Sequence, residues 1–166
     1  MKAFFVILLL SCSVSSYAQP AKIMHTEASI GMHPYWFEKL YPDSLFDIKK
    51  EFKDDKLIYL LTDTEKRILF TFSYCYYSSS EEETFRNAQL LEVSVFYKFD
   101  DKLPAAGQFA PILTKYVDTY SSEYILTKDE STSSSTYTWS WDDGFEVHLQ
   151  YANSSAIAWF ELSKDY

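Results

Sequence analysis

The stretch from Thr136 to Tyr151 reads TYTWSWDDGFEVHLQY. Apolar and polar residues alternate on both sides of an acidic turn, and this period of two is typical of strands with one buried face. A three-residue turn at 142–144 puts the apolar residues of both arms on one face, whereas a two-residue turn mixes the two faces. Gly144 can adopt the left-handed conformation that closes such a turn with a bulge. The stretch therefore predicts an antiparallel β-hairpin.

The aromatic stripe of this hairpin is expected to lie in the core. In the predicted register Trp139 lies opposite Val147, so the tryptophans share a face with aliphatic residues of the second arm. The alternative is that Trp139 and Trp141 are exposed, where they stack on sugar rings or anchor a protein partner. The alternation itself favours the core interpretation.

Five further segments show the same alternation or a short apolar run, and we expect them to be strands. They are residues 57–61, 67–77, 91–99, 123–127 and 156–162. The last of them is expected to be buried on both faces. Residues 78–83, which are serines followed by glutamates, are expected to form a solvated loop.

Two segments follow a helical period and begin at a proline, a residue that suits the first helical position. They are a broken helix from Pro34 to Phe52, interrupted at Pro42, and a helix from Pro111 to Tyr120. Strands and helices do not alternate singly, so the sequence predicts an α+β fold with an antiparallel sheet of about six to seven strands. Each half runs helix and then strands, which suggests a loose tandem repeat.

The N-terminus has the features of a secretory signal peptide. A basic start precedes the apolar run 3–10, and small residues at Ser16 and Ala18 suit cleavage after Ala18. The alternative is a lipoprotein signal with Cys12 as the lipidated residue. We therefore expect a single globular domain from 19 to 166, exported to the periplasm or the extracellular space, without a transmembrane segment.

Composition excludes several function classes. The formal net charge is −9, so the surface disfavours nucleic acid and anionic membranes. The chain has only three glycines, and none lies in a glycine-rich phosphate-binding loop. After removal of the signal peptide Cys75 would be the single cysteine, so no internal disulfide is expected.

No sequence motif indicates a catalytic, metal or cofactor site, and we expect none of these. Spaced histidine pairs, paired cysteines and calcium-binding loops are missing. His148 lies on the polar side of its strand opposite Thr138, where we expect a solvent-facing side chain. Cys75 has no neighbour in sequence that would lower its pKa. We expect both His148 and Cys75 to be dispensable for function.

The remaining functional signal is aromatic. Tyr35, Trp36 and Phe37 are consecutive, and a helix cannot bury all three, so this segment is the first candidate for a contact surface. Trp139, Trp141 and His148 are weaker candidates. We expect an exported, bacterial-type, non-enzymatic binding or inhibitor-like module that recognises a protein or a glycan. The alternatives are a hydrolase with dispersed carboxylates and a structural lipoprotein of the cell envelope.

Overall fold

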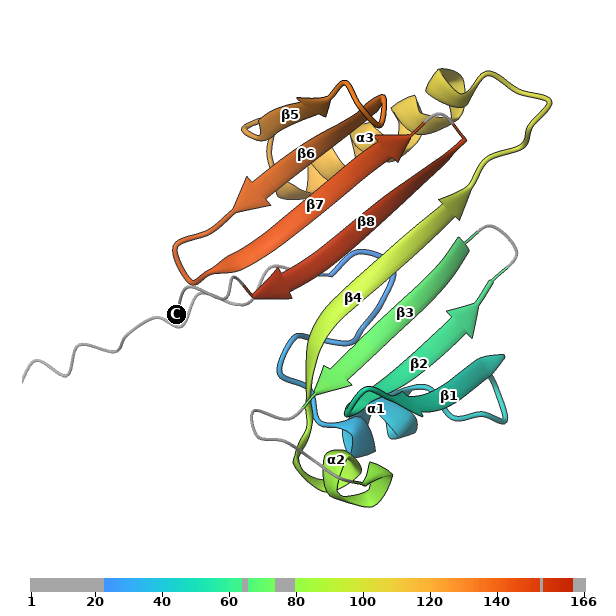
Figure 1. Ribbon diagram of the computed structural model, residues 1–166, viewed down its shortest axis with the longest axis vertical. Coiled ribbons are helices and arrows are strands. Elements are labelled where there is room, and N and C mark those ends of the chain that lie inside the picture. The colour runs from blue at the N-terminus through green and yellow to red at the C-terminus, as the bar shows by residue number, and fades with distance from the viewer. Residues whose placement is uncertain (1–22, 64–65, 74–79, 153, 163–166) are drawn as a thin grey trace, which may run out of the picture.

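A computed structural model describes residues 23–63, 66–73, 80–152 and 154–162 of the chain. Within these residues it contains three helices and one eight-stranded antiparallel sheet (Figure 1). In chain order the elements are α1 (Pro34–Leu40), β1 (Ile48–Lys53), β2 (Lys56–Thr62), β3 (Lys66–Ser73), α2 (Glu81–Asn87), β4 (Gln89–Lys98), α3 (Ala105–Tyr120), β5 (Ile125–Asp129), β6 (Ser134–Ser140), β7 (Phe145–Ala152) and β8 (Ser155–Leu162). No helix among the described residues is long and apolar enough to cross a membrane.

The sheet consists of two four-stranded meanders joined side by side. Its strand order is β1-β2-β3-β4-β8-β7-β6-β5, so the last strands of the two halves, β4 and β8, are neighbours at the centre. A helix precedes each meander, and α2 is inserted before β4. The predicted antiparallel α+β fold is confirmed, with more strands and helices than expected. A common origin of the two halves stays a prediction.

Both long meanders turn their apolar side to the same face of the sheet. Antiparallel residues in direct register share a face, and one such row crosses five strands. The row runs through Tyr59, Phe70, Val93, Phe160 and Val147. Its members are at most 2% exposed. The sheet therefore has one continuous buried face.

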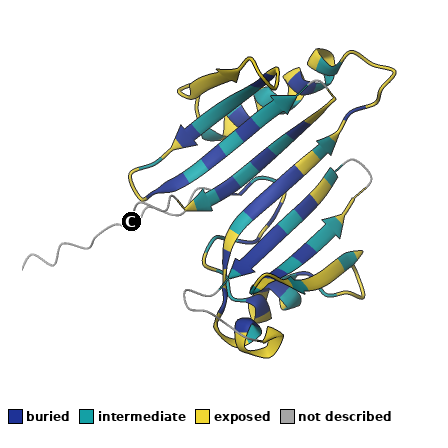
Figure 2. Ribbon diagram, in the orientation of Figure 1, coloured by how far each residue is buried: buried dark blue, intermediate teal, exposed yellow. Residues whose placement is uncertain are grey.

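The helices α1 and α3 cover that buried face. The Phe37 ring of α1 lies 4.6 Å from the Phe70 ring and 4.8 Å from the Tyr59 ring, measured between centroids. In the other half Tyr116 of α3 stacks on Phe160. In Figure 1 α3 lies behind β6 and β7, so the view looks onto the opposite face, which no described helix covers. Figure 2 shows buried and less buried residues alternating along the central strands.

The predicted hairpin is confirmed in its register and its turn. Trp139 pairs with Val147, and Gly144 has a φ of +79°, in the left-handed region. The amide of Trp141 donates to the Phe145 carbonyl at 3.1 Å and closes the loop. Trp139 is 2% exposed. Its indole N–H donates to the Ser121 carbonyl at 2.9 Å, which satisfies the polar atom of a buried ring.

The second part of the predicted broken helix is wrong, because residues 48–53 form β1. The spacing of Ile48 and Phe52 fits both a helix and one face of a strand, so the period was ambiguous. Lys50 lies between them on the same face. Its ammonium group pairs with Glu38 at 3.3 Å and with Glu81 at 3.2 Å, which allows a lysine at an inward-facing position.

The predicted loop over 78–83 is wrong for its described part, where α2 begins at Glu81. The Ser80 hydroxyl accepts a hydrogen bond from the Glu83 amide at 3.2 Å, and three glutamates fill the first turn. A serine followed three residues later by a glutamate is a capping box, and acidic residues favour a helix N-terminus. This signal was present in the sequence.

The helix predicted to begin at Pro111 begins at Ala105 and contains that proline. Proline lacks the amide that would bond to the carbonyl four residues earlier, here Gly107. Both residues are exposed, so water can satisfy the freed carbonyl. The loop before the helix is fixed by the Gln108 side chain, which bonds the backbone amide and carbonyl of Asp100 at 2.7 and 2.9 Å.

Two strands differ from prediction in the faces they bury. A register shift beside Thr71 makes Leu90 the inward residue of β4 and leaves Leu91 43% exposed. β8 was expected to be buried on both faces, but it alternates, and Trp159 is only partly buried on the uncovered side.

Replacing Trp139 by alanine should lower the free energy of unfolding by about 3–5 kcal/mol, because it leaves a cavity under α3. Trp36→Ala is the matched control: that ring is 60% exposed, so the expected change is within about 0.5 kcal/mol. Denaturant titration of both variants measures the difference. Equal effects would contradict the assignment of Trp139 to the core.

Candidate functional site

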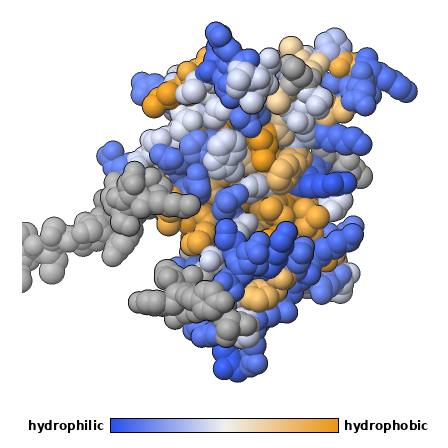
Figure 3. Space-filling view, viewed as in Figure 1, coloured by the Kyte–Doolittle hydropathy of each residue, from blue (hydrophilic) through white to orange (hydrophobic). Residues whose placement is uncertain are grey.

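The uncovered face of the sheet has an apolar middle. Figure 3 shows hydrophobic side chains near the centre of this face, among hydrophilic ones. The apolar residues whose register places them here are Ile58, Leu60, Leu69, Phe96, Ile157 and Trp159. Phe96 is the more accessible of the two aromatic residues in this set, Phe96 and Trp159, and its exposed fraction is 39%. We name this surface the open face.

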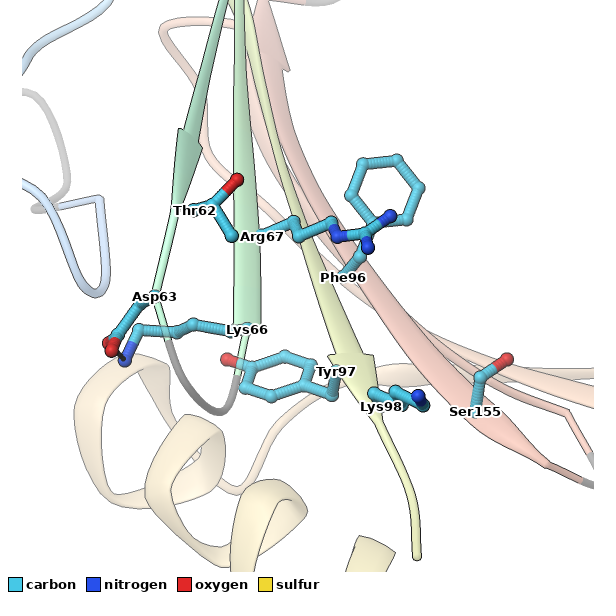
Figure 4. Close-up of a pocket in the computed structure, with 8 residues that line it drawn as sticks. All are labelled: Thr62, Asp63, Lys66, Arg67, Phe96, Tyr97, Lys98 and Ser155. Carbon is cyan, nitrogen blue, oxygen red and sulfur yellow. Dashed lines mark hydrogen bonds and ion pairs between the residues drawn. The ribbon is translucent and has the colours of Figure 1, made fainter. Parts of the chain in front are cut away.

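A hollow of about 510 Å³ lies at one end of the open face. It is formed where β2 ends, β3 begins, β4 ends and β8 begins (Figure 4). The residues that line it are Thr62, Asp63, Lys66, Arg67, Phe96, Tyr97, Lys98 and Ser155. This size falls in the range of roughly 300–1,000 Å³ that is usual for small-molecule sites. We name it the cationic hollow.

The charge of the cationic hollow is opposite to that of the chain. Three of its lining residues are cations and one is an acid, whereas the whole chain has a net charge of −9. Lys66 pairs with Asp63 at 3.0 Å. Among the described residues neither Arg67 nor Lys98 has an ion pair. Two positive charges are therefore available to an anion.

Strand pairing brings the parts of the hollow together. Arg67 of β3 is in direct register with Phe96 of β4, and Figure 4 shows its guanidinium group beside that ring. Lys98 is in register with Ser155 of β8. Thr62 of β2 pairs with Arg67 and adds a hydroxyl. The cations, the ring and the hydroxyls thus come from four strands.

A second hollow, of about 400 Å³, lies beside α2 and β1 and is a weaker candidate. Its lining contains three glutamates, one lysine and Phe85. The lysine, Lys50, already pairs with Glu38 and Glu81, and its ammonium lies 4.8 Å from the Phe85 ring centre. Its one cation is therefore occupied within the protein.

Tyr97 connects the cationic hollow to the covered side of the sheet. Its hydroxyl lies 2.7 Å from Nε2 of His25 and 3.1 Å from the hydroxyl of Tyr116. Burial raises the pKa of Tyr97 to about 12, so the phenol is neutral at physiological pH and remains a hydrogen-bonding group. Tyr97 therefore contributes a neutral hydroxyl group to the hollow, on the covered side of the sheet.

We expect the imidazole of His25 to titrate near pH 4. Partial burial, followed by the charges of Lys66 and Lys115, lowers its pKa from 6.5 to about 4. The unfolded chain takes up this proton near pH 6.5 and the folded chain only near 4, so stability should fall as pH drops between these values. Because His25 is more than a third exposed, solvent screening should limit the effect to below about 1 kcal/mol.

Proton NMR of the imidazole resonance gives the midpoint, and unfolding of His25→Asn at several pH values isolates the contribution to stability. The variant should lose less stability than the parent between pH 6.5 and 4. A midpoint at or above 6.5 in the parent would contradict this expectation.

A second cluster on the open face joins two carboxylates and an imidazole. Nε2 of His148 lies 3.2 Å from Oε2 of Glu146 and 3.7 Å from Oε1 of Glu161. One donor atom from each of the three residues lies within 4.8 Å of the others. Nδ1 of His148 lies 3.1 Å from the hydroxyl of Thr138, and its ring stacks on Trp159 at 4.8 Å between centroids.

His148 is therefore not the solvent-facing residue predicted from the alternation, because its side chain is only 13% exposed. Its strand position is on the open face as expected, opposite Thr138. The Trp159 ring and the flanking Glu146 cover it. These neighbours shield the imidazole even though no helix lies above it.

The other predicted binding residues do not meet at one site. Tyr35 and Trp36 are 45% and 60% exposed while Phe37 is buried, as the helical geometry of α1 requires. They lie on the helix that covers the other face. Trp139 is in the core, and Trp141 is half-buried with its ring 5.5 Å from that of Phe145. The predictions for Cys12, Ala18 and Cys75 fall outside the described residues.

The residues of the cationic hollow were not identified from the sequence. Phe96 carried a weak signal, because it places a phenylalanine at a polar-face position of an alternating strand. Arg67 had no such signal, since exposed arginines at strand ends are ordinary. The two residues become neighbours only when β3 and β4 pair.

The chain matches no protein-family model, no curated protein and no solved structure. The features of the described residues that bear on function are therefore the cationic hollow and the cluster of Glu146, His148 and Glu161.

Proposed function

We propose that the chain is a non-enzymatic binding module that takes a compact anionic ligand, a carboxylated saccharide, in the cationic hollow. One observation carries the proposal: Arg67 and Lys98 are without ion pairs among the described residues, beside the exposed ring of Phe96, in a strongly acidic protein. Positive charges that are not needed for internal pairs are available for recognition.

The cations suit a carboxylate. The planar guanidinium group of Arg67 can donate two parallel hydrogen bonds to one carboxylate, and such charge-assisted pairs are the strong ones. Lys98, which also lines the hollow, adds a second positive charge. The acidic remainder of the surface repels anions elsewhere and so favours binding at this place.

The position in the sheet favours a compact ligand over a peptide strand. An extended peptide adds to an exposed sheet edge, and the edges here are β1 and β5. The cationic hollow lies on β2, β3, β4 and β8, inside the sheet, where every strand already has both neighbours. A ligand at this place must be recognised by side chains.

The remaining lining favours a saccharide. An exposed aromatic ring offers an apolar surface to the C–H face of a sugar, and a few polar groups fix its orientation. Phe96 supplies the ring, and Thr62 and Ser155 supply hydroxyls. The predicted export of the chain, to the periplasm or the extracellular space, would bring it to compartments where such glycans occur.

The other functions considered from the sequence have less support. A hydrolase needs two carboxylates beside a bound substrate. Glu146 and Glu161 come within 4.8 Å of each other, but neither lines the cationic hollow. A structural lipoprotein depends on Cys12, which lies outside the described residues.

Titration calorimetry of the full chain with oligogalacturonate tests the proposal, and the methyl-esterified oligomer is the matched uncharged ligand. We expect the acidic oligomer to bind and the ester to bind at least about tenfold more weakly, since a hydrogen bond to a charged group contributes roughly 1.5–3 kcal/mol. Inorganic phosphate as a third ligand separates saccharide recognition from binding of any anion.

Arg67→Gln should reduce the affinity for the acidic oligomer by about tenfold or more, and Phe96→Ala should weaken both oligomers. Arg86→Gln is the matched control, because it removes an exposed arginine on α2 that pairs with Glu82. Equal binding of ester and acid, or equal loss in Arg67→Gln and Arg86→Gln, would refute the site. Binding of phosphate as tight as the oligomer would refute the saccharide.

A further inference from the structure

Strand pairing alone assembles the cluster of Glu146, His148 and Glu161. Glu146 and His148 are two residues apart on β7, so they share a face, and Glu161 of β8 lies directly opposite Glu146. All three belong to the open face. Their donor atoms converge although 13 positions of the chain separate His148 from Glu161.

The imidazole is held in one orientation with one nitrogen free of hydrogen bonds. The contact of Nδ1 with the Thr138 hydroxyl and the stack on Trp159 fix the ring. Nε2 is buried and has no hydrogen-bond partner among the described residues, although two carboxylate oxygens lie near it. A metal-binding histidine has this arrangement: a neighbouring group holds one ring nitrogen, and the other ring nitrogen faces the metal ion.

Charge also favours a cation at this place. Glu92 of β4 is directly opposite Glu161, so Glu146, Glu161 and Glu92 lie abreast on three neighbouring strands. Like charges directly opposite each other destabilise a sheet. The Ser94 hydroxyl donates to Glu92 at 2.6 Å, but it brings no charge. A bound cation would remove the repulsion.

We propose that Glu146, His148 and Glu161 bind a divalent transition-metal ion of the zinc type. Zinc bonds to histidine nitrogen and carboxylate oxygen at roughly 2.0–2.2 Å, so neighbouring ligand atoms of a tetrahedral site are about 3.3–3.5 Å apart. The distances of 3.2 and 3.7 Å from Nε2 to the two carboxylate oxygens are close to this spacing. One nitrogen and two oxygens match the donor preference of zinc better than that of calcium or magnesium.

Three protein ligands leave one tetrahedral position for water or a ligand group. This site lies apart from the cationic hollow, because none of its three residues lines that hollow. It therefore does not depend on the proposed saccharide function. The proposed metal site differs from the prediction of no metal site made from the sequence. That prediction considered only the spacing of ligand residues along the chain.

Calorimetric titration of the full chain with zinc chloride tests the proposal, and visible absorption of the cobalt(II) form reports the donor geometry. We expect one ion per chain and a rise in melting temperature with zinc. Glu161→Gln and His148→Ala should each weaken binding at least about tenfold, as loss of one ligand requires. Glu161→Gln keeps the shape of the side chain, so it decides the question if His148→Ala, which loses the Trp159 stack, does not fold.

Two matched controls separate this site from adventitious binding. Glu51→Gln removes a carboxylate from the same face at the edge strand β1, and His33→Asn removes an imidazole while keeping a group that can cap α1. Both should bind zinc as the parent does. An absence of zinc binding, or equal affinity in Glu161→Gln and Glu51→Gln, would overturn the proposal and leave an ion pair between His148 and the glutamates.

Discussion

The structure depends on one constraint: the apolar side chains of neighbouring strands must face the same way across the whole sheet. A slip of one residue in any strand would turn its core residues to the solvent side. The row from Tyr59 to Val147 shows that the register is kept through both meanders. Because α1 and α3 both pack on this side, the other face is left for polar and partly exposed residues. Both proposed sites are on that other face or at its end.

Local features of the fold could be predicted from the sequence because nearby residues determine them. The hairpin at 136–151 follows from alternation and from Gly144, and the structure has the predicted register. The predictions for residues 48–52 and for the start of α3 are wrong because each segment carries two sequence signals that favour different structures. The spacing of Ile48 and Phe52 satisfied a helix as well as a strand, and Pro111 marked a helix start although the helix accommodates it seven residues in.

The candidate sites could not be predicted in the same way, because their residues meet only through strand order. Arg67 and Phe96 are 29 positions apart in the chain. They become neighbours because β3 pairs with β4, and the sequence does not reveal this pairing. His148 was correctly placed opposite Thr138, but its partner Glu161 is on β8 and its stack on Trp159 also comes from there. Alternation assigns a residue to a face. It does not say which residues will lie beside it.

The central place of β8 has a consequence for how the chain folds. Apart from β3 and β4, which are joined through α2, neighbouring strands within each meander form hairpins, which close short loops and form quickly. Joining them requires β4 to pair with β8, and residues in register such as Val93 and Phe160 are 67 positions apart. Closing a loop of this length before its contacts form is a slow entropic step. During synthesis the edge of β4 that faces β8 therefore stays without its partner until β8 has been made.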